Sequence, residues 1–337
     1  MTDETSLNLF QQQDVNRRRT LWLLCGFVLF FSWLGFGGDY IYSLSTAHAP
    51  PPAQHHVWWF GFAMLAAGAV LARYAYQTGA EKVLWATGAE EIITPADDRQ
   101  KQLVNVVEEM AVAAGVARPR IWIVPDPDPN AFATGTDPQQ AHVAVTRGLL
   151  DLCTRDELQA VIAHELGHVK NLDVRLMTTL AALVGAVLLM RDGTSRIFFG
   201  GRGGGRREGR KSDLGPLAVI LIVVWVLSWI LAPIITQLLA MAVSRKREYL
   251  ADAMSAQFTR NPLALASALQ KIEAADLPTK SIKGGTAHMC IADPLGRRLG
   301  LQDGVVADVL ATHPPMVKRI AILKGMGYAQ LKKEVTG

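Results

Sequence analysis

Four long apolar segments constrain the fold of this chain more than any other feature. They cover residues 21–37, 57–72, 176–190 and 214–243, and none of them contains a charged residue. Crossing the ~30 Å hydrocarbon core of a bilayer takes about 20 apolar residues. The first, second and fourth segments therefore predict transmembrane helices. Their length and lack of charge disfavour the alternative, buried helices of a large soluble core.

The basic residues indicate how these helices would be oriented. Arg17, Arg18 and Arg19 precede the first segment, whereas residues 38–56 contain no lysine or arginine. Cytoplasmic loops carry an excess of positive charge, so we expect a cytoplasmic N-terminus, an outward loop at 38–56 and a cytoplasmic segment at 75–175. The net charge of +4 is then explained by contacts with anionic lipid headgroups, and we predict no nucleic-acid partner.

The third apolar segment leaves the topology open. Its 15 residues make about 22 Å of helix, which is short for a span. The loop that follows, residues 191–213, is basic and Gly-rich, and the positive-inside rule disfavours placing it outside. The third and fourth segments form either a hairpin of two spans, which we favour, or one span after a half-buried or re-entrant segment. We interpret the glycine–arginine tract at 200–211 as a flexible loop rather than an RNA-binding element.

These features divide the chain into five parts. Residues 1–19 form a cytoplasmic tail, 20–74 a two-helix membrane anchor, 75–175 the first part of a cytoplasmic catalytic domain, 176–243 the third and fourth apolar segments, and 244–337 the second part of that domain. The cysteines, Cys25, Cys153 and Cys290, are odd in number and far apart, so they indicate neither a disulfide framework nor a cysteine metal site.

The strongest chemical motif is His164-Glu165-Leu166-Gly167-His168. On a helix, two histidines four residues apart lie on one face about one turn apart, so both can bind a single metal ion. The glutamate between them can deprotonate a metal-bound water, which is the chemistry of zinc peptidases. Thr154 and Glu157 form a capping box that predicts where this helix begins. Nothing breaks the helical pattern before residue 190, which allows the helix to continue into the third apolar segment.

The rest of the first cytoplasmic segment has weaker patterns. Residues 99–116 have the apolar spacing of a helix, and residues 120–124 and 142–146 read as short strands. The residues between the strands, 125–138, are rich in turn formers.

A third metal ligand is expected after the fourth apolar segment. Glu248 and Asp252 form an E-x-x-x-D pattern with helical spacing. Glu248 can complete the set of three protein ligands typical of catalytic zinc, and Asp252 can accept a hydrogen bond from the second ring nitrogen of a ligating histidine. The plainer alternatives are a surface Glu248 paired with a neighbouring base and an Asp252 on a helix face. Asp173 we interpret as a structural partner of Lys170 or Arg175.

Several ordered motifs together resemble the HtpX-type membrane zinc endopeptidases, gluzincins related to the type I CAAX prenyl proteases. They are the N-terminal pair of apolar segments, residues 130–135 (NAFATG), 145–150 (VTRGLL), 164–168, the two later apolar segments, 248–252, and His313-Pro314 with Arg319. The resemblance covers nearly the whole chain. It implies a mainly α integral membrane protein, with a zincin-like (gluzincin) catalytic domain, a small β-sheet and membrane helices.

The resemblance also implies roles for individual residues. His164, His168 and Glu248 would bind one Zn²⁺ per chain, and Glu165 would be the general base. Residues Asn130, Ala131, Phe132 and Ala133 would form an edge strand to which a peptide substrate adds. His313 would lie near the scissile carbonyl, where it could donate to the oxyanion; its alternative is a place in the cap of a helix starting at Pro314-Pro315. Arg319 would organise that loop.

The expected function is proteolysis of misfolded or damaged membrane proteins during stress, in the inner membrane of a bacterium, with a cytoplasmic active site. The expected partners are protein or peptide substrates and the lipid bilayer. One alternative is a narrow-specificity processing protease of the CAAX type. Another is a non-catalytic zinc protein that binds unfolded clients, against which Glu165 argues, because a structural zinc site needs no general base.

Overall fold

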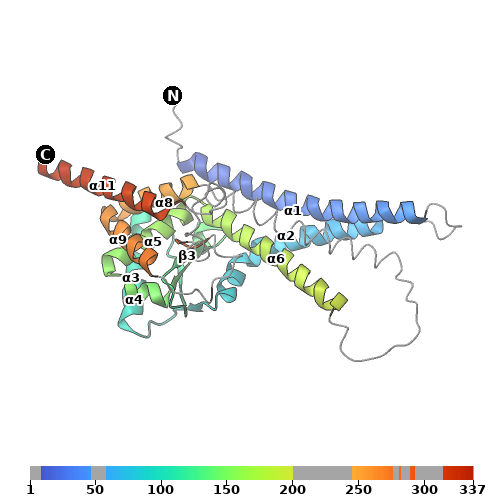
Figure 1. Ribbon diagram of the computed structural model, residues 1–337, viewed down its shortest axis with the longest axis horizontal. Coiled ribbons are helices and arrows are strands. Elements are labelled where there is room, and N and C mark those ends of the chain that lie inside the picture. Colours follow the sequence, from blue (N-terminus) through green and yellow to red (C-terminus); the bar gives the residue numbers. More distant parts are fainter. Residues whose placement is uncertain are drawn as a thin grey trace, which may run out of the picture. The chain divides into compact units, whose positions relative to one another are not determined.

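The computed structural model describes residues 9–46, 58–199, 245–275, 281, 289–292 and 314–336 (Figure 1). It is mostly helical, with one small mixed sheet. The helices are α1 (Leu9–Thr46), α2 (Trp59–Ala86), α3 (Asp98–Ala114), α4 (Arg147–Leu152), α5 (Arg155–Lys170), α6 (Asp173–Phe199), α8 (Arg245–Thr259), α9 (Pro262–Ala274) and α11 (Met316–Thr336), with a 3₁₀ turn η1 (Pro138–Gln140). Expectations for the fourth apolar segment, the glycine–arginine tract and His313 lie outside the described residues.

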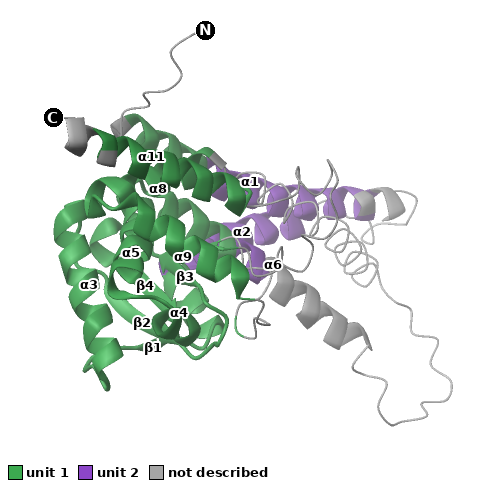
Figure 2. Ribbon diagram, turned by 60° about the vertical axis from the view of Figure 1, so that its left-hand side comes forward, with its two compact units in different colours: residues 1–20, 78–181, 239–337 green, residues 21–77, 182–238 purple. Residues whose placement is uncertain are grey.

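The chain divides into two compact units (Figure 2). Unit 1 comprises residues 1–20, 78–181 and 239–337, and unit 2 comprises residues 21–77 and 182–238. Three helices, α1, α2 and α6, contribute residues to both units. The HExxH motif and the E-x-x-x-D motif both lie in unit 1.

Membrane-crossing character is clearest in α1. Among the described residues, its stretch Gln11–Tyr40 is the helix that is long and apolar enough to span a bilayer, judged by length and composition. α2 has sufficient length but does not meet the same combined test. The crossing assigned to residues 57–72 therefore stays a prediction, as do those assigned to the third and fourth segments.

Within unit 2, α1 and α2 approach closely at a glycine. The backbone N–H of Gly61 donates to Oδ2 of Asp39 over 2.6 Å, and Asp39 is buried. A side chain at position 61 would meet the ring of Phe36. The absence of a Cβ at Gly61 thus allows the close contact between the two helices.

The sheet lies in unit 1 and has the strand order β1-β2-β4-β3. β1 (Glu90–Glu91) pairs antiparallel with β2 (Arg120–Val124), β2 pairs parallel with β4 (His142–Thr146), and β4 pairs antiparallel with β3 (Ala131–Thr134). The strands predicted at 120–124 and 142–146 are confirmed with the same bounds. The turn-rich region between them contains β3, which forms one edge of the sheet.

The core of unit 1 surrounds α5. This helix packs against α3, α8, α9 and β3, and nearly all its residues from Leu158 to Val169 are buried. Thr154 caps its N-terminus, and the carboxylate of Glu157 accepts the Thr154 backbone N–H, so the predicted capping box is confirmed. The predicted helix at 99–116 is also confirmed as α3, which begins one residue earlier and ends at Ala114.

The continuation of the motif helix into the third apolar segment is wrong. α5 ends at Lys170, and α6 begins at Asp173. Leu172 between them has a φ of 60°, in the left-handed region that ends a right-handed helix. The N–H of Asn171 still bonds to the Gly167 carbonyl, and that of Leu172 bonds to Val169. The break brings Asp173 back towards the preceding turn of α5.

Candidate metal centre

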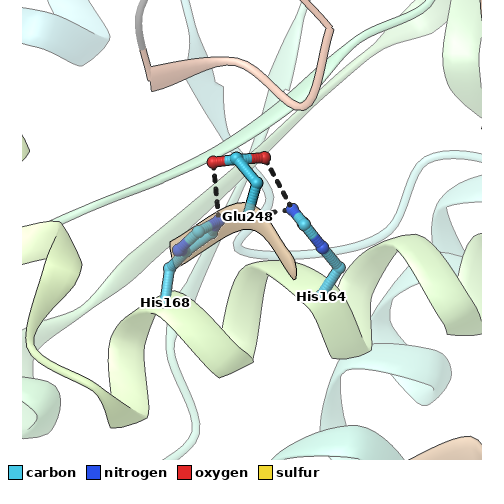
Figure 3. A group of neighbouring side chains, drawn as sticks. All are labelled: His164, His168 and Glu248. Carbon is cyan, nitrogen blue, oxygen red and sulfur yellow. Dashed lines mark hydrogen bonds and ion pairs between the residues drawn. The ribbon is translucent and has the colours of Figure 1, made fainter. Parts of the chain in front are cut away.

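His164, His168 and Glu248 converge in the interior of unit 1 (Figure 3). The Nε2 atoms of the two histidines are 3.2 Å apart. Oε2 of Glu248 lies 3.7 Å from Nε2 of His164, and its Oε1 lies 3.5 Å from Nε2 of His168. All three residues are buried. Two neighbouring positions on α5 and one on α8 therefore present a nitrogen, a nitrogen and a carboxylate to one point.

Packing between the two helices positions Glu248. α5 and α8 form the most extensive helix pair of the described core. The hydroxyl of Ser255, two turns beyond Glu248, donates to the Ala160 carbonyl of α5 over 2.7 Å. This bond prevents α8 from sliding along α5. It therefore helps to hold Glu248 opposite the two imidazoles.

The other nitrogen of each imidazole faces a carboxylate. Nδ1 of His164 lies 3.0 Å from Oδ1 of Asp252, and Nδ1 of His168 lies 3.2 Å from Oδ2 of Asp173. Ionised carboxylates only accept hydrogen bonds, so each Nδ1 carries the proton in the neutral ring. Each Nε2 lone pair is then directed at the partner ring and Glu248, which is how metal-binding histidines are commonly oriented.

This donor set fits a divalent cation such as zinc. Zinc takes nitrogen and oxygen ligands at about 2.0–2.2 Å in a tetrahedron, which separates the ligand atoms by roughly 3.3–3.6 Å. The two Nε2 atoms are 3.2 Å apart, each lies 3.5–3.7 Å from a different oxygen of Glu248, and one ligand atom from each residue falls within 4.8 Å of the others. In the neutral rings the two Nε2 lone pairs and the Glu248 carboxylate are oriented towards one point, where a cation could accept all three as ligands. His164, His168 and Glu248 are therefore the residues that would hold the ion.

The electrostatics of the two rings differ. Burial lowers the pKa of His164 below its ordinary value. Burial also acts to lower the pKa of His168, but the hydrogen bond to Asp173 and the charge of Glu248 outweigh it and raise that pKa to about 9. A cation bound at His168 would therefore compete with a proton for the same ring nitrogen.

Glu165 lies beside this triad and is buried as well. Burial raises its pKa to about 7, and the nearby charge of Glu248 adds to the shift. The backbone N–H of Ala133, on β3, acts in the opposite direction and favours the ionised carboxylate. Its Oε1 has no hydrogen-bond partner among the described residues. A carboxyl group with a pKa near neutrality can both accept and return a proton.

Arg319 contacts the carboxylates of both Glu248 and Asp252. It is fully buried on α11, and its Nη1 donates to the Ile291 carbonyl over 2.9 Å and lies 3.4 Å from Oε2 of Glu248. Its Nε and Nη2 donate to Asp252. The guanidinium therefore compensates the buried negative charge of Glu248 and Asp252, a direct role that the sequence-based expectation of a loop organiser did not include.

The expected substrate strand is β3, whose outer edge the chain itself partly covers. Phe132 forms an antiparallel bridge with Cys290, and the N–H of Ile291 donates to the Ala131 carbonyl over 3.0 Å. The side chain of Asn130 is buried and donates to the Ala292 carbonyl over 2.9 Å. Asn130 is thus a structural anchor for residues 290–292. Strand β3 packs against α5, and the backbone of Ala133 lies close enough to Glu165 to influence the pKa of its carboxylate.

Sequence reasoning assigned Asp173 to the wrong partners and did not identify Asn16 at all. Asp173 does not pair with Lys170 or Arg175, whose described hydrogen bonds go to the carbonyls of Ala114 and Thr136. It binds His168 and the side chain of Asn16 on α1. The aspartate five residues after the motif was a signal for the first contact. The second contact joins residues 157 positions apart, and no local pattern indicates it.

Comparison with known proteins assigns the family. Residues 97–327 match the family model described as "Peptidase family M48". The chain belongs to peptidase family M48. This M48 chain is 38% identical to a "Protease HtpX homolog" of Caldanaerobacter subterraneus subsp. tengcongensis, over 96% of its length and 99% of the relative. It is 43% identical to a "Protease HtpX homolog" of Dictyoglomus turgidum, over 77% and 81% of the two chains.

A solved structure is also similar to the M48 chain. The crystal structure of S. mikatae Ste24p aligns with 90% of this chain and 66% of its own, at a TM-score of 0.46 and 16% identity. Family membership and the convergence of His164, His168 and Glu248 together indicate a metalloprotease.

Proposed function

We propose that this M48 protein is a zinc-dependent endopeptidase of a bacterial inner membrane, with a cytoplasmic active site and several membrane passes. It would cleave misfolded or damaged membrane proteins under stress. The observation that carries the catalytic part is the convergence of two histidines and a glutamate beside the buried carboxyl of Glu165. The membrane location is supported by Gln11–Tyr40 of α1, and the substrate class by the resemblance to HtpX-type proteases.

The number of ligands favours catalysis over a structural role. Within the part of the chain that the structure describes, the candidate group has three ligands. Structural zinc sites are usually closed by four protein ligands, whereas catalytic sites keep one position open. Bound in this group, zinc supplies Lewis acidity and lowers the pKa of a coordinated water towards 7.

The chain's own residues supply the proton transfer and the positioning. Glu165, with its pKa of about 7, accepts a proton from the attacking water and delivers it to the amine that leaves. Asp252 and Asp173 hold the two imidazoles in the tautomer that directs Nε2 at the ion. Arg319 lowers the pKa of Asp252 against the effect of burial, and it places a positive charge 3.4 Å from Glu248.

Strand β3 is the proposed binding edge for the substrate. A peptide that adds antiparallel to an exposed edge gains main-chain hydrogen bonds from alternate residues. On β3 those residues are Ala131 and Ala133, because Asn130 directs its carbonyl at Thr146 of β4. Residues 290–291 occupy the Ala131 position. A peptide that extends over the whole strand must therefore displace them, whereas the end near Ala133 leads directly to Glu165.

The test is the Glu165→Gln variant of the full chain, purified in detergent. It should retain one zinc per chain and lose at least about a thousandfold in cleavage of an unfolded, fluorescently labelled protein. The matched control is Glu109→Gln, an exposed glutamate paired with Arg155, which should cleave normally. Undiminished cleavage by Glu165→Gln, or full activity of the metal-free protein, would overturn the proposal.

A further inference from the structure

We propose that Asn16, on the N-terminal part of α1, is a positioning residue for the metal centre. It holds the carboxylate of Asp173 and through it orients His168. The inference rests on the zinc site proposed above. Asn16 lies outside residues 97–327, in a segment that the sequence suggests is only a polar tail before the membrane.

The contact is buried and specific. Asn16 has no exposed surface, and its Nδ2 donates to Oδ1 of Asp173 over 2.8 Å and to the Asn171 carbonyl over 2.9 Å. Both partners are acceptors, so the amide nitrogen must face them. One primary amide has two N–H donors, and this site uses both.

Asp173 divides its two oxygens between Asn16 and the metal ligand. Oδ1 accepts from Asn16, and Arg247 Nη1 lies 3.7 Å from the same oxygen. Oδ2 bonds to Nδ1 of His168. A carboxylate fixed at one oxygen cannot rotate about its Cβ–Cγ bond, so its other oxygen stays aligned with the imidazole. The orientation of His168, and of the Nε2 atom that faces Glu248, then depends on Asn16.

The backbone at this turn adds to the dependence. Leu172, between Asn171 and Asp173, adopts a left-handed conformation that is unfavourable for a residue with a Cβ. Asn16 binds the residue on each side of it. Removing the amide would release the residues that hold Leu172 in this conformation, and Asp173 would be free to move away from His168.

A neighbouring residue of α1 offers a matched control. Gln13 lies one turn before Asn16, and its Nε2 donates to the Lys170 carbonyl over 2.7 Å. Carbonyls in the last turn of a helix lack intrahelical partners, so both side chains cap the C-terminus of α5. Gln13 makes that cap without touching Asp173. If this face of α1 only stabilised the fold, Asn16→Ala and Gln13→Ala would change the zinc affinity equally.

The experiment measures zinc affinity by chelator competition, with the full-length protein in detergent. Asn16→Ala should weaken zinc binding by about tenfold, the lower end of the 10–100-fold effects known for outer contacts of metal ligands. Gln13→Ala should leave the affinity unchanged. Asn16→Asp keeps the size of the side chain but loses both donors and repels Asp173, so it should bind zinc at least as weakly as Asn16→Ala. Should Asn16→Ala fold poorly, Asn16→Ser is the second variant: it stays neutral and polar but is too short to reach both acceptors, and it should also weaken zinc binding.

A double-mutant cycle separates positioning from general destabilisation. In an Asp173→Ala background, which itself weakens zinc binding, adding Asn16→Ala should cause no further loss. Equal effects of Asn16→Ala and Gln13→Ala, or a full loss that persists without Asp173, would overturn the inference. Zinc binding that survives His164→Ala and Glu248→Ala would instead overturn the metal site and the proposed function.

Discussion

Arg319 donates two hydrogen bonds to Asp252, from Nε to Oδ2 over 2.9 Å and from Nη2 to Oδ1 over 2.7 Å. The same Oδ1 lies 3.0 Å from Nδ1 of His164. A carboxylate on α8 thus joins a guanidinium of α11 to a candidate metal ligand of α5. Because all three side chains are buried, the loss of one leaves the others with uncompensated charge or polarity.

Arg319→Ala is therefore expected to destabilise the protein by about 3–5 kcal/mol, since it leaves Asp252 and Glu248 buried without their cation. Arg319→Lys keeps the charge but not the planar fork, and should recover only part of the loss. Thermal unfolding monitored in detergent measures both. The control is Arg155→Ala, which breaks an exposed pair with Glu109 and should cost under about 1 kcal/mol. Similar midpoints for Arg319→Ala and Arg155→Ala would contradict this role.

Removal of zinc should abolish proteolysis and also lower the thermal midpoint. A ligand present at 100 times its dissociation constant stabilises the native state by about 2.7 kcal/mol. Adding zinc back to the stripped protein should restore both proteolysis and the thermal midpoint. In the His168→Ala variant, added zinc should change neither of them. Calorimetry and cleavage of a labelled unfolded protein, performed on the same samples, provide the check. A stripped protein whose midpoint does not respond to zinc would argue against the site.

Gly148→Ala should destabilise unit 1 by about 1–3 kcal/mol. A Cβ at Gly148 would collide with the backbone carbonyl of Pro127, against which the first turn of α4 lies. The N–H of Gly148 donates to the Asp126 carbonyl over 3.0 Å, so the two segments cannot separate without losing that bond. Gly325→Ala on α11 is the control: a Cβ there meets nothing, and helix propensity predicts a gain of up to about 1 kcal/mol. Equal unfolding midpoints for the two variants would refute the close approach.

Glu157 should make stability depend on acid pH. Burial acts to raise its pKa, but hydrogen bonds from Lys271, Ser267 and Thr154 outweigh this and lower it below the ordinary 4.5. A group whose pKa is lowered on folding stabilises the protein above its unfolded value, and this contribution is lost as the pH falls through the folded value. Glu157→Gln should therefore be less stable than wild type by about 1–2 kcal/mol at pH 7.

The difference between Glu157→Gln and wild type should narrow as the pH falls below about 4.5, the ordinary pKa of the group. Unfolding midpoints measured from pH 7 to pH 3 test this. A difference that stays constant across the series would mean that the carboxylate charge contributes nothing to the cap.

The elements that the sequence predicted correctly are those whose signal is local. The two predicted strands, β2 and β4, have β-branched residues at alternate positions, and the start of α5 carries both halves of a capping box. The histidine pair follows from helical spacing alone. Glu248 depended on a second motif about 80 residues away, which the need for a third ligand suggested and the resemblance to a known family supported.

The features that could not be predicted have no local signal. Leu172 ends α5 without the glycine or proline that usually marks such a break, because tertiary contacts around it hold a left-handed backbone. Asn16 looks like any polar residue ahead of an apolar stretch, and its partner lies across the fold. Arg319 was recognised as structural, but its bonds to Asp252 depend on how α8 and α11 pack.

The contact between Asn16 and Asp173 bears on how shortened versions of this protein can be made. A catalytic fragment cut at the family boundary, residue 97, would omit Leu9–Thr46 of α1 entirely. Such a fragment would contain all three metal ligands and still lack the amide that steadies one of them. Recombinant forms intended for solution studies should therefore keep the N-terminal part of α1, or receive it as a separate peptide.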